Sequence, residues 1–211
     1  WISTFAGGLN KYIKPLPNIQ VISNSIFSKF SISNYAISLT EFSGNELIVG
    51  TYDGLGFINY KKNFFLPLYK NPDRTTPLSA CITSIKKDPF NNIWFGTLSK
   101  GLAKFNLQNK SLLSFTPETN PKINDWNVNG LQIDKDTILW ISTISGGIGK
   151  FNIKTGDFLK LINIPDDNSS LSSNRVKTIF LDSKDNLWVG TEMGLNLLDK
   201  RTNKFRRFDY F

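Results

Sequence analysis

Trp188-Val-Gly-Thr191 is the last of five copies of one short pattern that runs through this chain. The earlier copies are Trp1-Ile-Ser-Thr4, Ile48-Val-Gly-Thr51, Trp94-Phe-Gly-Thr97 and Trp140-Ile-Ser-Thr143. Their first residues are 47, 46, 46 and 48 positions apart in a chain of 211 residues. A motif that recurs at a fixed spacing usually reflects architecture, and a period of about 40 to 50 residues is typical of a propeller blade.

The residues around each copy predict four short strands per period. An aspartate stands six positions before the tryptophan, at Asp88, Asp134 and Asp182, after alternating apolar residues and before a polar turn. This pattern is typical of a strand that enters a hairpin. After the threonine comes a short turn closed by a glycine, which supplies the positive φ that tight hairpins need. Two more short strands follow, and no segment sustains apolar residues at helical spacing.

We therefore predict an all-β fold, a β-propeller built from four-stranded antiparallel blades. The chain is interpreted as one domain of residues 1–211, with a partial blade at 1–30 and blades at 31–70, 78–116, 123–163 and 171–210. Linkers rich in Pro, Asn, Asp and Ser join the blades. Propellers have four to eight blades. We expect these four complete blades and one partial blade to be a fragment of a larger, seven-bladed type of ring, excised from a longer protein because the chain begins at Trp1 without an initiator methionine.

Composition narrows the chemistry that this chain can perform. Histidine is absent, which excludes Ser-His-Asp and Cys-His nucleophile activation, histidine general bases and zinc sites with imidazole ligands. The single cysteine, Cys81, excludes an internal disulfide. We identify no catalytic constellation, no metal site and no cofactor motif, and we predict that this region is not an enzyme.

The net charge is +8, from 25 Lys and Arg against 17 Asp and Glu. Such a balance favours acidic partners or, more simply, a lysine-rich solvated surface. Because most lysines are scattered singly, we prefer the second interpretation and expect no nucleic-acid partner. No run approaches the roughly 18 apolar residues of a membrane span, and no signal-peptide pattern opens the chain. Any membrane attachment is therefore expected through other domains.

With the blade written out, the chain resembles the two-component regulator propeller repeat. The best match is Ser170-Leu-Ser-Ser-Asn-Arg-Val-Lys-Thr-Ile-Phe-Leu-Asp-Ser-Lys-Asp-Asn-Leu-Trp-Val-Gly-Thr-Glu-Met-Gly-Leu195. The resemblance implies the extracytoplasmic, periplasmic sensor half of a bacterial hybrid two-component histidine kinase, anchored in the inner membrane by domains that follow. In that family, propellers precede an immunoglobulin-like domain, a membrane span and the kinase, and they detect breakdown products of complex polysaccharides.

The second copy departs from the repeat at two positions. Ile48 stands where the pattern has tryptophan, and Phe42 stands where it has aspartate. The linker at residues 122–126, which ends in Trp126, also departs from the Ser-Leu-Ser-x-Asn pattern. A weakened consensus has two interpretations, structural drift and a specialised site, and drift is the default.

The recurring residues are expected to be structural. Trp94, Trp140 and Trp188 lie mid-strand, where a large ring packs between neighbouring blades. The Gly or Ser that follows them by two positions, and Gly50 in the second copy, is expected to permit close packing on the inner strands.

Residues that differ between repeats are better candidates for binding, because propellers vary their loops on one face. The linkers and the turns after the threonines should meet on one face around the central channel. An aromatic ring beside amides and cations suits a carbohydrate: the ring stacks on the apolar sugar face, and polar groups bind hydroxyls, carboxylates or sulfates. The predicted ligand-binding residues are Trp126, Tyr35, Arg175, Arg74 and Asn174, in that order, and then Tyr52, Lys100, Ser145 and Glu192. The alternative for Trp126 is a ring that fills a gap in its linker.

Three hypotheses follow. The leading one is a non-catalytic sensor that binds a small polysaccharide-derived oligosaccharide, neutral or acidic, and transmits occupancy through altered packing of domains or of a homodimer of the full-length protein. The second is a lyase-like enzyme that uses a carboxylate pair on a propeller scaffold to act on a glycan. The third is a protein-interaction scaffold of the WD-repeat kind, although the Gly-His and Trp-Asp signature of that class is missing.

Overall fold

The structure is a computed structural model that describes residues 2–4, 8–13, 18–22, 35–62, 64–68, 76–120, 123 and 125–208, with backbone only over the first three of these ranges. A three-stranded sheet contains β1 (Ile2–Thr4), β2 (Gly8–Ile13) and β3 (Asn18–Ile22). Four four-stranded sheets follow, and a single 3₁₀ turn, η1 (Pro77–Ser79), precedes the second of them.

The four-stranded sheets are, in chain order, β4 (Ala36–Ser43), β5 (Glu46–Thr51), β6 (Gly54–Asn59) and β7 (Phe64–Pro67); β8 (Cys81–Lys87), β9 (Asn92–Leu98), β10 (Leu102–Asn106) and β11 (Leu112–Phe115); β12 (Val128–Asp134), β13 (Ile138–Thr143), β14 (Ile148–Asn152) and β15 (Phe158–Leu161); and β16 (Val176–Leu181), β17 (Leu187–Thr191), β18 (Gly194–Asp199) and β19 (Lys204–Phe208). Within each sheet, every strand pairs antiparallel with the next strand in the sequence.

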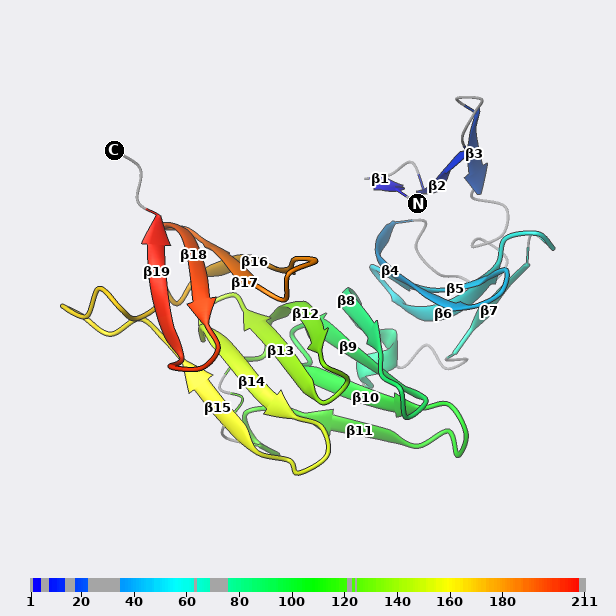
Figure 1. The fold of residues 1–211 in the computed structure, drawn as a ribbon. Helices are drawn as coiled ribbons and strands as arrows, with labels where there is room; N and C mark the ends of the chain where they lie inside the picture. Colours follow the sequence, from blue (N-terminus) through cyan, green and yellow to red (C-terminus); the bar gives the residue numbers. More distant parts are fainter. Residues whose placement is uncertain are drawn as a thin grey trace.

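The sheets are arranged as propeller blades. The first strand of each four-stranded sheet lies against the first strand of the next, so β4, β8, β12 and β16 are the innermost strands. Figure 1 shows the sheets following one another in an arc, from the N-terminal strands to the C-terminal strand β19. The prediction of an all-β propeller with four-stranded antiparallel blades is confirmed.

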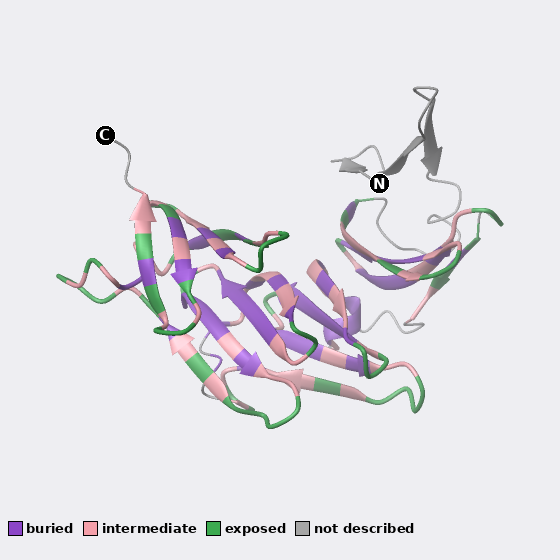
Figure 2. Ribbon diagram, in the orientation of Figure 1, coloured by how far each residue is buried: buried purple, intermediate pink, exposed green. Residues whose placement is uncertain are grey.

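The hydrophobic core lies between neighbouring sheets. Buried residues are concentrated in the middle strands, and exposed residues lie mostly in the turns (Figure 2). Trp94 on β9 packs against Phe151 of the following sheet, with ring centroids 5.6 Å apart, and Trp140 on β13 packs with Val176 of the sheet after that. Trp94 and Trp140 are 1% and 0% exposed, whereas Trp188 is half-buried. The predicted core role of the first two tryptophans is confirmed, and replacing such a ring by alanine typically costs about 3–5 kcal/mol.

The aspartate six positions before each tryptophan accepts the indole hydrogen bond. Asp88 Oδ2 accepts from Trp94 Nε1 at 2.8 Å, and Asp88 Oδ1 accepts from the backbone N–H groups of Phe90 and Asn92 at 2.8 and 2.9 Å. One carboxylate thus closes the hairpin turn and satisfies a buried indole. The same indole bond joins Trp140 to Asp134 at 3.2 Å and Trp188 to Asp182 at 2.9 Å.

The threonine that ends each motif copy caps the turn after it. Thr97 Oγ1 donates to the Gly101 carbonyl at 2.8 Å and accepts from the Lys100 N–H at 3.0 Å. Gly101 has a φ of +73°, which confirms the predicted left-handed glycine in this turn. The same cap and a positive-φ glycine occur at Thr51 with Gly54, Thr143 with Gly147, and Thr191 with Gly194.

The small residue in the motif permits adjacent sheets to approach closely. A Cβ on Gly50 would lie 2.5 Å from Cγ2 of Ile82, and a Cβ on Gly96 would lie 2.6 Å from Cγ1 of Val128. Both contacts are on the innermost strand of the next sheet, and both are shorter than carbon atoms tolerate. The packing role predicted for these glycines is confirmed.

Candidate ligand-binding face

The turns after the threonines meet the starts of the innermost strands at one end of each sheet. The backbone N–H of Tyr52 donates to the carbonyl of Tyr35 at 3.1 Å, and the N–H of Glu192 donates to the carbonyl of Arg175 at 3.1 Å. An equivalent bond of 3.0 Å occurs in the sheet of β12 to β15. The register therefore places Tyr35 beside Tyr52 and Arg175 beside Glu192.

Two of these turns also contact the sheet that follows. The N–H of Gly101 donates to the carbonyl of Trp126 at 2.8 Å, and the N–H of Gly147 donates to the carbonyl of Asn174 at 3.0 Å. The turn that carries Lys100 therefore lies against the linker residue Trp126. Main-chain bonds thus join the candidate residues of one blade to those of the next.

A buried carboxylate that the sequence analysis missed anchors the linker before β12. Asp125 is 6% exposed, and its Oδ2 accepts from the Ser145 N–H and Oγ at 2.7 and 2.9 Å, while Oδ1 accepts from the Asn127 N–H at 2.9 Å. Burial alone would raise the pKa of Asp125, but the hydrogen bonds from Asn127 and Ser145 outweigh it and hold that pKa below its usual range. Ser145 is exposed, but its N–H and its hydroxyl group already donate hydrogen bonds to Asp125, so its first role is to hold the linker. The only sequence signal for Asp125 is its position in a linker that departs from the repeat.

Aromatic surface is available at two places on this face. Tyr35 is 39% exposed and Tyr52 is 57% exposed, at the end of the sheet that contains β4 to β7. Trp126 is half-buried, so part of its ring remains accessible while the rest packs in the linker. Lys100, next to Trp126 through the adjacent turn, is also half-buried.

Charged side chains gather at the start of β16. Arg175 Nε lies 3.0 Å from Glu192 Oε2, and Lys177 Nζ lies 2.7 Å from Glu192 Oε1. The hydrogen bond from Lys177, aided by the charges of Lys177 and Arg175, holds the pKa of Glu192 below its usual range. The side chains of Arg175 and Lys177 are 61% and 58% exposed. Two exposed cations share one carboxylate, which leaves this part of the face positive.

Asn174 has a structural role at this face. Its Oδ1 accepts from the N–H of Asn163 at 2.7 Å, and Asn163 Nδ2 in turn donates to the Leu171 carbonyl at 2.7 Å. These bonds hold the two ends of the linker between β15 and β16 together, and they occupy the amide oxygen that we expected to bind a ligand. Arg74, also predicted, lies outside the described residues.

The innermost strands carry polar side chains that join neighbouring sheets. Ser38 Oγ donates to the Ile82 carbonyl at 2.9 Å, and Asn129 Nδ2 donates to the Val176 carbonyl at 2.7 Å. Together, the innermost strands β4, β8, β12 and β16 line a cavity of about 240 Å³ at the centre of the arc. Lys86 contributes to its wall, and burial lowers the pKa of that lysine. The candidate face therefore surrounds one end of a polar channel.

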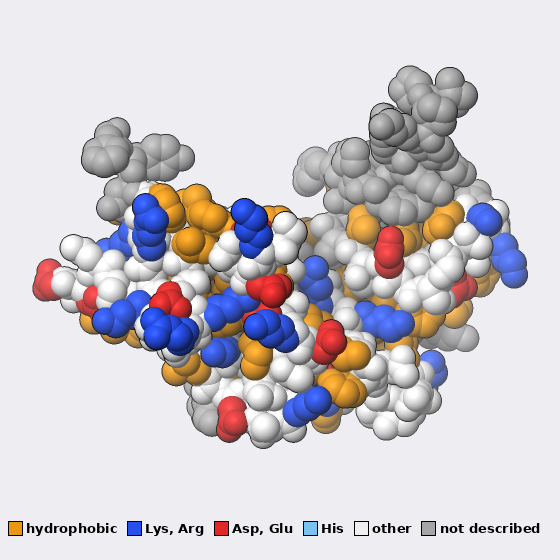
Figure 3. Space-filling view, in the orientation of Figure 1, with side chains coloured by type: hydrophobic (Ala, Val, Ile, Leu, Met, Phe, Trp, Pro, Cys, Tyr) orange, Lys and Arg blue, Asp and Glu red, His pale blue; other side chains and the backbone are white. Residues whose placement is uncertain are grey.

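Three further observations concern surface charge, metal ligands and membrane spans. Lys and Arg are interspersed with Asp and Glu on the face shown in Figure 3. Within the described ranges, no group of three or more His, Cys, Asp or Glu side chains is placed to hold a metal ion. In the same ranges, no helix has the length and apolar character needed to cross a membrane.

Successive four-stranded meanders around a polar channel define this chain as a β-propeller. Residues 170–193 match the family model described as two component regulator propeller. The resemblance inferred from Ser170–Leu195 is confirmed by this match.

One match in sequence and two matches in structure extend the comparison to most of the chain. The chain is 26% identical over 186 residues to histidine kinase P4 of Formosa agariphila, a match that covers 83% of this chain and 14% of that protein. The extracellular domain of the putative hybrid two component system BT3049 from B. thetaiotaomicron has the same fold, with a TM-score of 0.75 and 19% identity over 95% of this chain and 27% of that one. The extracellular domain of the putative one component system BT4673 from the same organism gives 0.74 and 19%, over 97% of this chain and 25% of that one.

Proposed function

We propose that this chain is the non-catalytic, ligand-binding propeller of a periplasmic sensor in a two-component signalling protein. The observation that carries the proposal is the two component regulator propeller match at residues 170–193, set in a chain whose whole fold is similar to two extracellular domains of signalling systems. Histidine kinase P4 is a much longer protein, of which this chain spans 14%. The signalling activity would therefore reside in other parts of such a protein.

The proposed ligand is a small oligosaccharide released from a polysaccharide. A pyranose ring has an apolar face that stacks on aromatic side chains and a hydroxyl rim that needs hydrogen-bond partners. Tyr35, Tyr52 and Trp126 present aromatic surface at the same end of the innermost strands. Arg175 and Lys177 add net positive charge there, which favours a ligand with a carboxylate or sulfate.

Calorimetry on the full chain with neutral and acidic oligosaccharides tests this function. We expect one class to bind, and we expect Trp126→Ala to weaken binding about 2- to 13-fold, the equivalent of the roughly 0.5–1.5 kcal/mol of one aromatic contact. Phe90→Ala is the matched control, because Phe90 is 45% exposed in the β8–β9 turn, at the opposite end of β8.

Two results would contradict the proposal. The ligand-binding role fails if no oligosaccharide binds, or if Trp126→Ala and Tyr35→Ala both leave the affinity unchanged. The non-catalytic role fails if mass spectrometry detects shortened or unsaturated products after the oligosaccharide has been incubated with the protein.

A further inference from the structure

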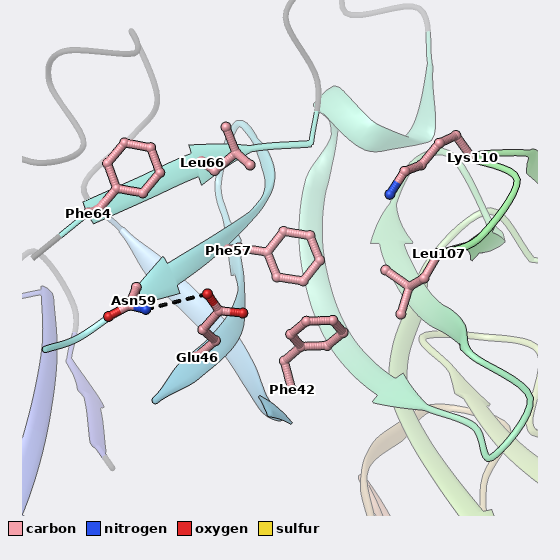
Figure 4. A pocket seen from close by; sticks show the side chains of 8 residues that line it. All are labelled: Phe42, Glu46, Phe57, Asn59, Phe64, Leu66, Leu107 and Lys110. Carbon is pink, nitrogen blue, oxygen red and sulfur yellow. Dashed lines mark hydrogen bonds between the residues drawn. The ribbon is translucent and has the colours of Figure 1, made fainter. Parts of the chain in front are cut away.

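A second cavity lies away from the channel, between the sheet of β4 to β7 and the sheet of β8 to β11. It has a volume of about 250 Å³, and most of its wall is apolar (Figure 4). Phe42 and Phe57 form its floor, with ring centroids 4.8 Å apart. Phe64 at its rim is 51% exposed. The volume is just below the roughly 300–1,000 Å³ of sites that enclose drug-sized ligands.

The cavity coincides with the departures of the second motif copy from the repeat. Phe42 occupies the position that is aspartate in the three later blades. Phe57 pairs with Ile48, and the residues that pair with the tryptophan at that position are Lys104, Lys150 and Leu197. Phe64 stands opposite Asn59, where the later blades have Ser111, Asp157 and Lys204. Three rings therefore replace mainly polar residues on three different strands, and all three line one cavity.

The same departures leave the Glu46 carboxylate without the aspartate that its counterpart Asn92 contacts. Asn92, the counterpart of Glu46, donates to Asp88 and accepts from Asn106 within its own blade. Glu46 has no such aspartate beside it, and among the described residues the one hydrogen bond to its carboxylate comes from Asn59 Nδ2 at 3.4 Å. No ion pair joins Glu46 to any other described residue. A carboxylate with spare acceptor capacity thus borders the apolar floor.

A lysine faces the cavity from the opposite side. Figure 4 shows the side chain of Lys110 extending toward the cavity from the β10–β11 turn, with the rings of Phe42 and Phe57 between it and Glu46. Within the described residues, Lys110 forms no ion pair. Its backbone has a φ of +60°, at the turn position where the next two blades have Gly156 and Asn203. A lysine is a less suitable residue for that backbone than glycine or asparagine.

We propose that this cavity binds a dipeptide with apolar side chains and free ends. The free ammonium group would pair with Glu46, the free carboxylate with Lys110, and the apolar side chains would cover Phe42 and Phe57. An extended dipeptide separates its two charged ends by roughly 7 Å, and Glu46 and Lys110 likewise lie on opposite sides of the apolar floor. The site is separate from the oligosaccharide face, so the two proposals stand or fall independently.

The probe is L-leucyl-L-leucine, titrated into the full chain and followed by calorimetry and by NMR. We expect binding with shift changes at Phe42, Phe57 and Leu107 and none at Trp126. Acetylation of the amino end or amidation of the carboxyl end removes one charge, and each change should weaken binding at least about 10-fold, as for the loss of a charge-assisted hydrogen bond. N-acetylglucosamine, a neutral sugar of comparable size, should not bind at this site.

Two variants distinguish binding from folding. Glu46→Gln and Lys110→Gly should each weaken binding about 10-fold or more, while Lys110→Gly keeps or raises the Tm because glycine accepts the left-handed backbone without strain. Lys62→Gln is the matched control, since Lys62 is an exposed lysine of the β6–β7 turn that does not line the cavity. The proposal is overturned if the dipeptide does not bind at millimolar concentration, if capped and free dipeptides bind equally, or if the two variants bind as the wild type does.

Discussion

At the scale of single residues, hydrogen bonds join the recurring residues of the repeat motif in pairs. The tryptophan is buried between sheets, and its indole N–H needs an acceptor there, because an unpaired buried donor costs about 1–3 kcal/mol. Asp88 provides that acceptor for Trp94, and its second oxygen closes the turn. The sequence pattern marked the aspartates as part of a hairpin but did not reveal this pairing. Both residues were therefore located correctly, but the reason for their fixed separation of six positions came only from the structure.

Acid should weaken the pair in the last blade. The hydrogen bond from Trp188 and those from Asn186 hold the pKa of Asp182 far below the usual value of about 3.9. A depressed native pKa contributes stability that is complete above the unfolded value and is lost as the pH falls toward the native value. We therefore expect the Tm to fall as the pH drops below about 4, and to fall less steeply in Asp182→Asn.

The measurement is the Tm by circular dichroism between pH 2 and pH 7, together with the Asp182 carboxyl resonance by NMR. Ser183→Ala, in the same turn, serves as the control variant and should follow the wild-type profile. A carboxyl that titrates at its ordinary value, or an unchanged slope in Asp182→Asn, would contradict the prediction.

At the scale of elements, the second strand of each blade is the core of the fold. β9 and β13 each bury five consecutive residues, because neighbouring sheets cover both of their faces. Such a strand shows no alternation of apolar and polar residues, and the sequence pattern identified it as a strand only because the motif recurs. The first strands bury only every third residue, since one side faces the polar channel. The glycine within the second strand sets how closely the next sheet can approach.

Replacing Gly96 by alanine should therefore destabilise the fold. The new Cβ would lie 2.6 Å from Val128 Cγ1 and 3.0 Å from the Val128 carbonyl oxygen. Overpacking of this kind typically costs about 1–3 kcal/mol, which chemical denaturation measures. Gly190→Ala is the matched control, because the nearest atom to its Cβ is Thr178 Cγ2 at 3.0 Å, and the next is 3.9 Å away. Equal losses in the two variants would show that sheet approach is not the cause.

At the scale of the whole molecule, the chain is an arc of sheets held together by contacts between neighbours. Three of the four core clusters combine residues of two adjacent sheets, as Trp140 of one sheet does with Val176 and Val189 of the next. Lys200 adds an ion pair of 2.5 Å to Asp134 in the preceding sheet. Stability in such a repeat arrangement is approximately a sum of repeat and nearest-neighbour terms.

The rate of amide hydrogen exchange should therefore be lower in the buried second strand of a blade than in its outermost strand. We expect the amides of β9 and β13 to exchange most slowly, and those of β11 and β15 to exchange faster, because the outer strands are edges with few buried side chains. Exchange measured by NMR or mass spectrometry at neutral pH tests this gradient. Uniform protection across the four strands of a blade would contradict it.

The sequence by itself determined the repeat, the four strands of each blade, the buried tryptophans and the close-packing glycines. These follow from local periodicity and from a motif that recurs every 46 to 48 residues. It also located the end of each sheet where the variable residues gather, but not that Ser145 and Asn174 are already held by Asp125 and Asn163. Those partners are 20 and 11 positions away, and their roles depend on which side chains the turns bring within bonding distance.

Only the tertiary structure decided what the departures of the second copy mean. Taken singly, Phe42 and Ile48 are compatible with drift, and nothing in the one-dimensional pattern connects them to Phe64 or Lys110. Sheet register places Phe57 and Phe64 on one side of a blade, Phe42 lines the same cavity from the irregularity between Glu41 and Ser43, and the packing of the next blade brings Lys110 opposite them. A cavity is defined by the atoms that surround it, and here those atoms come from four strands and a turn of two different blades.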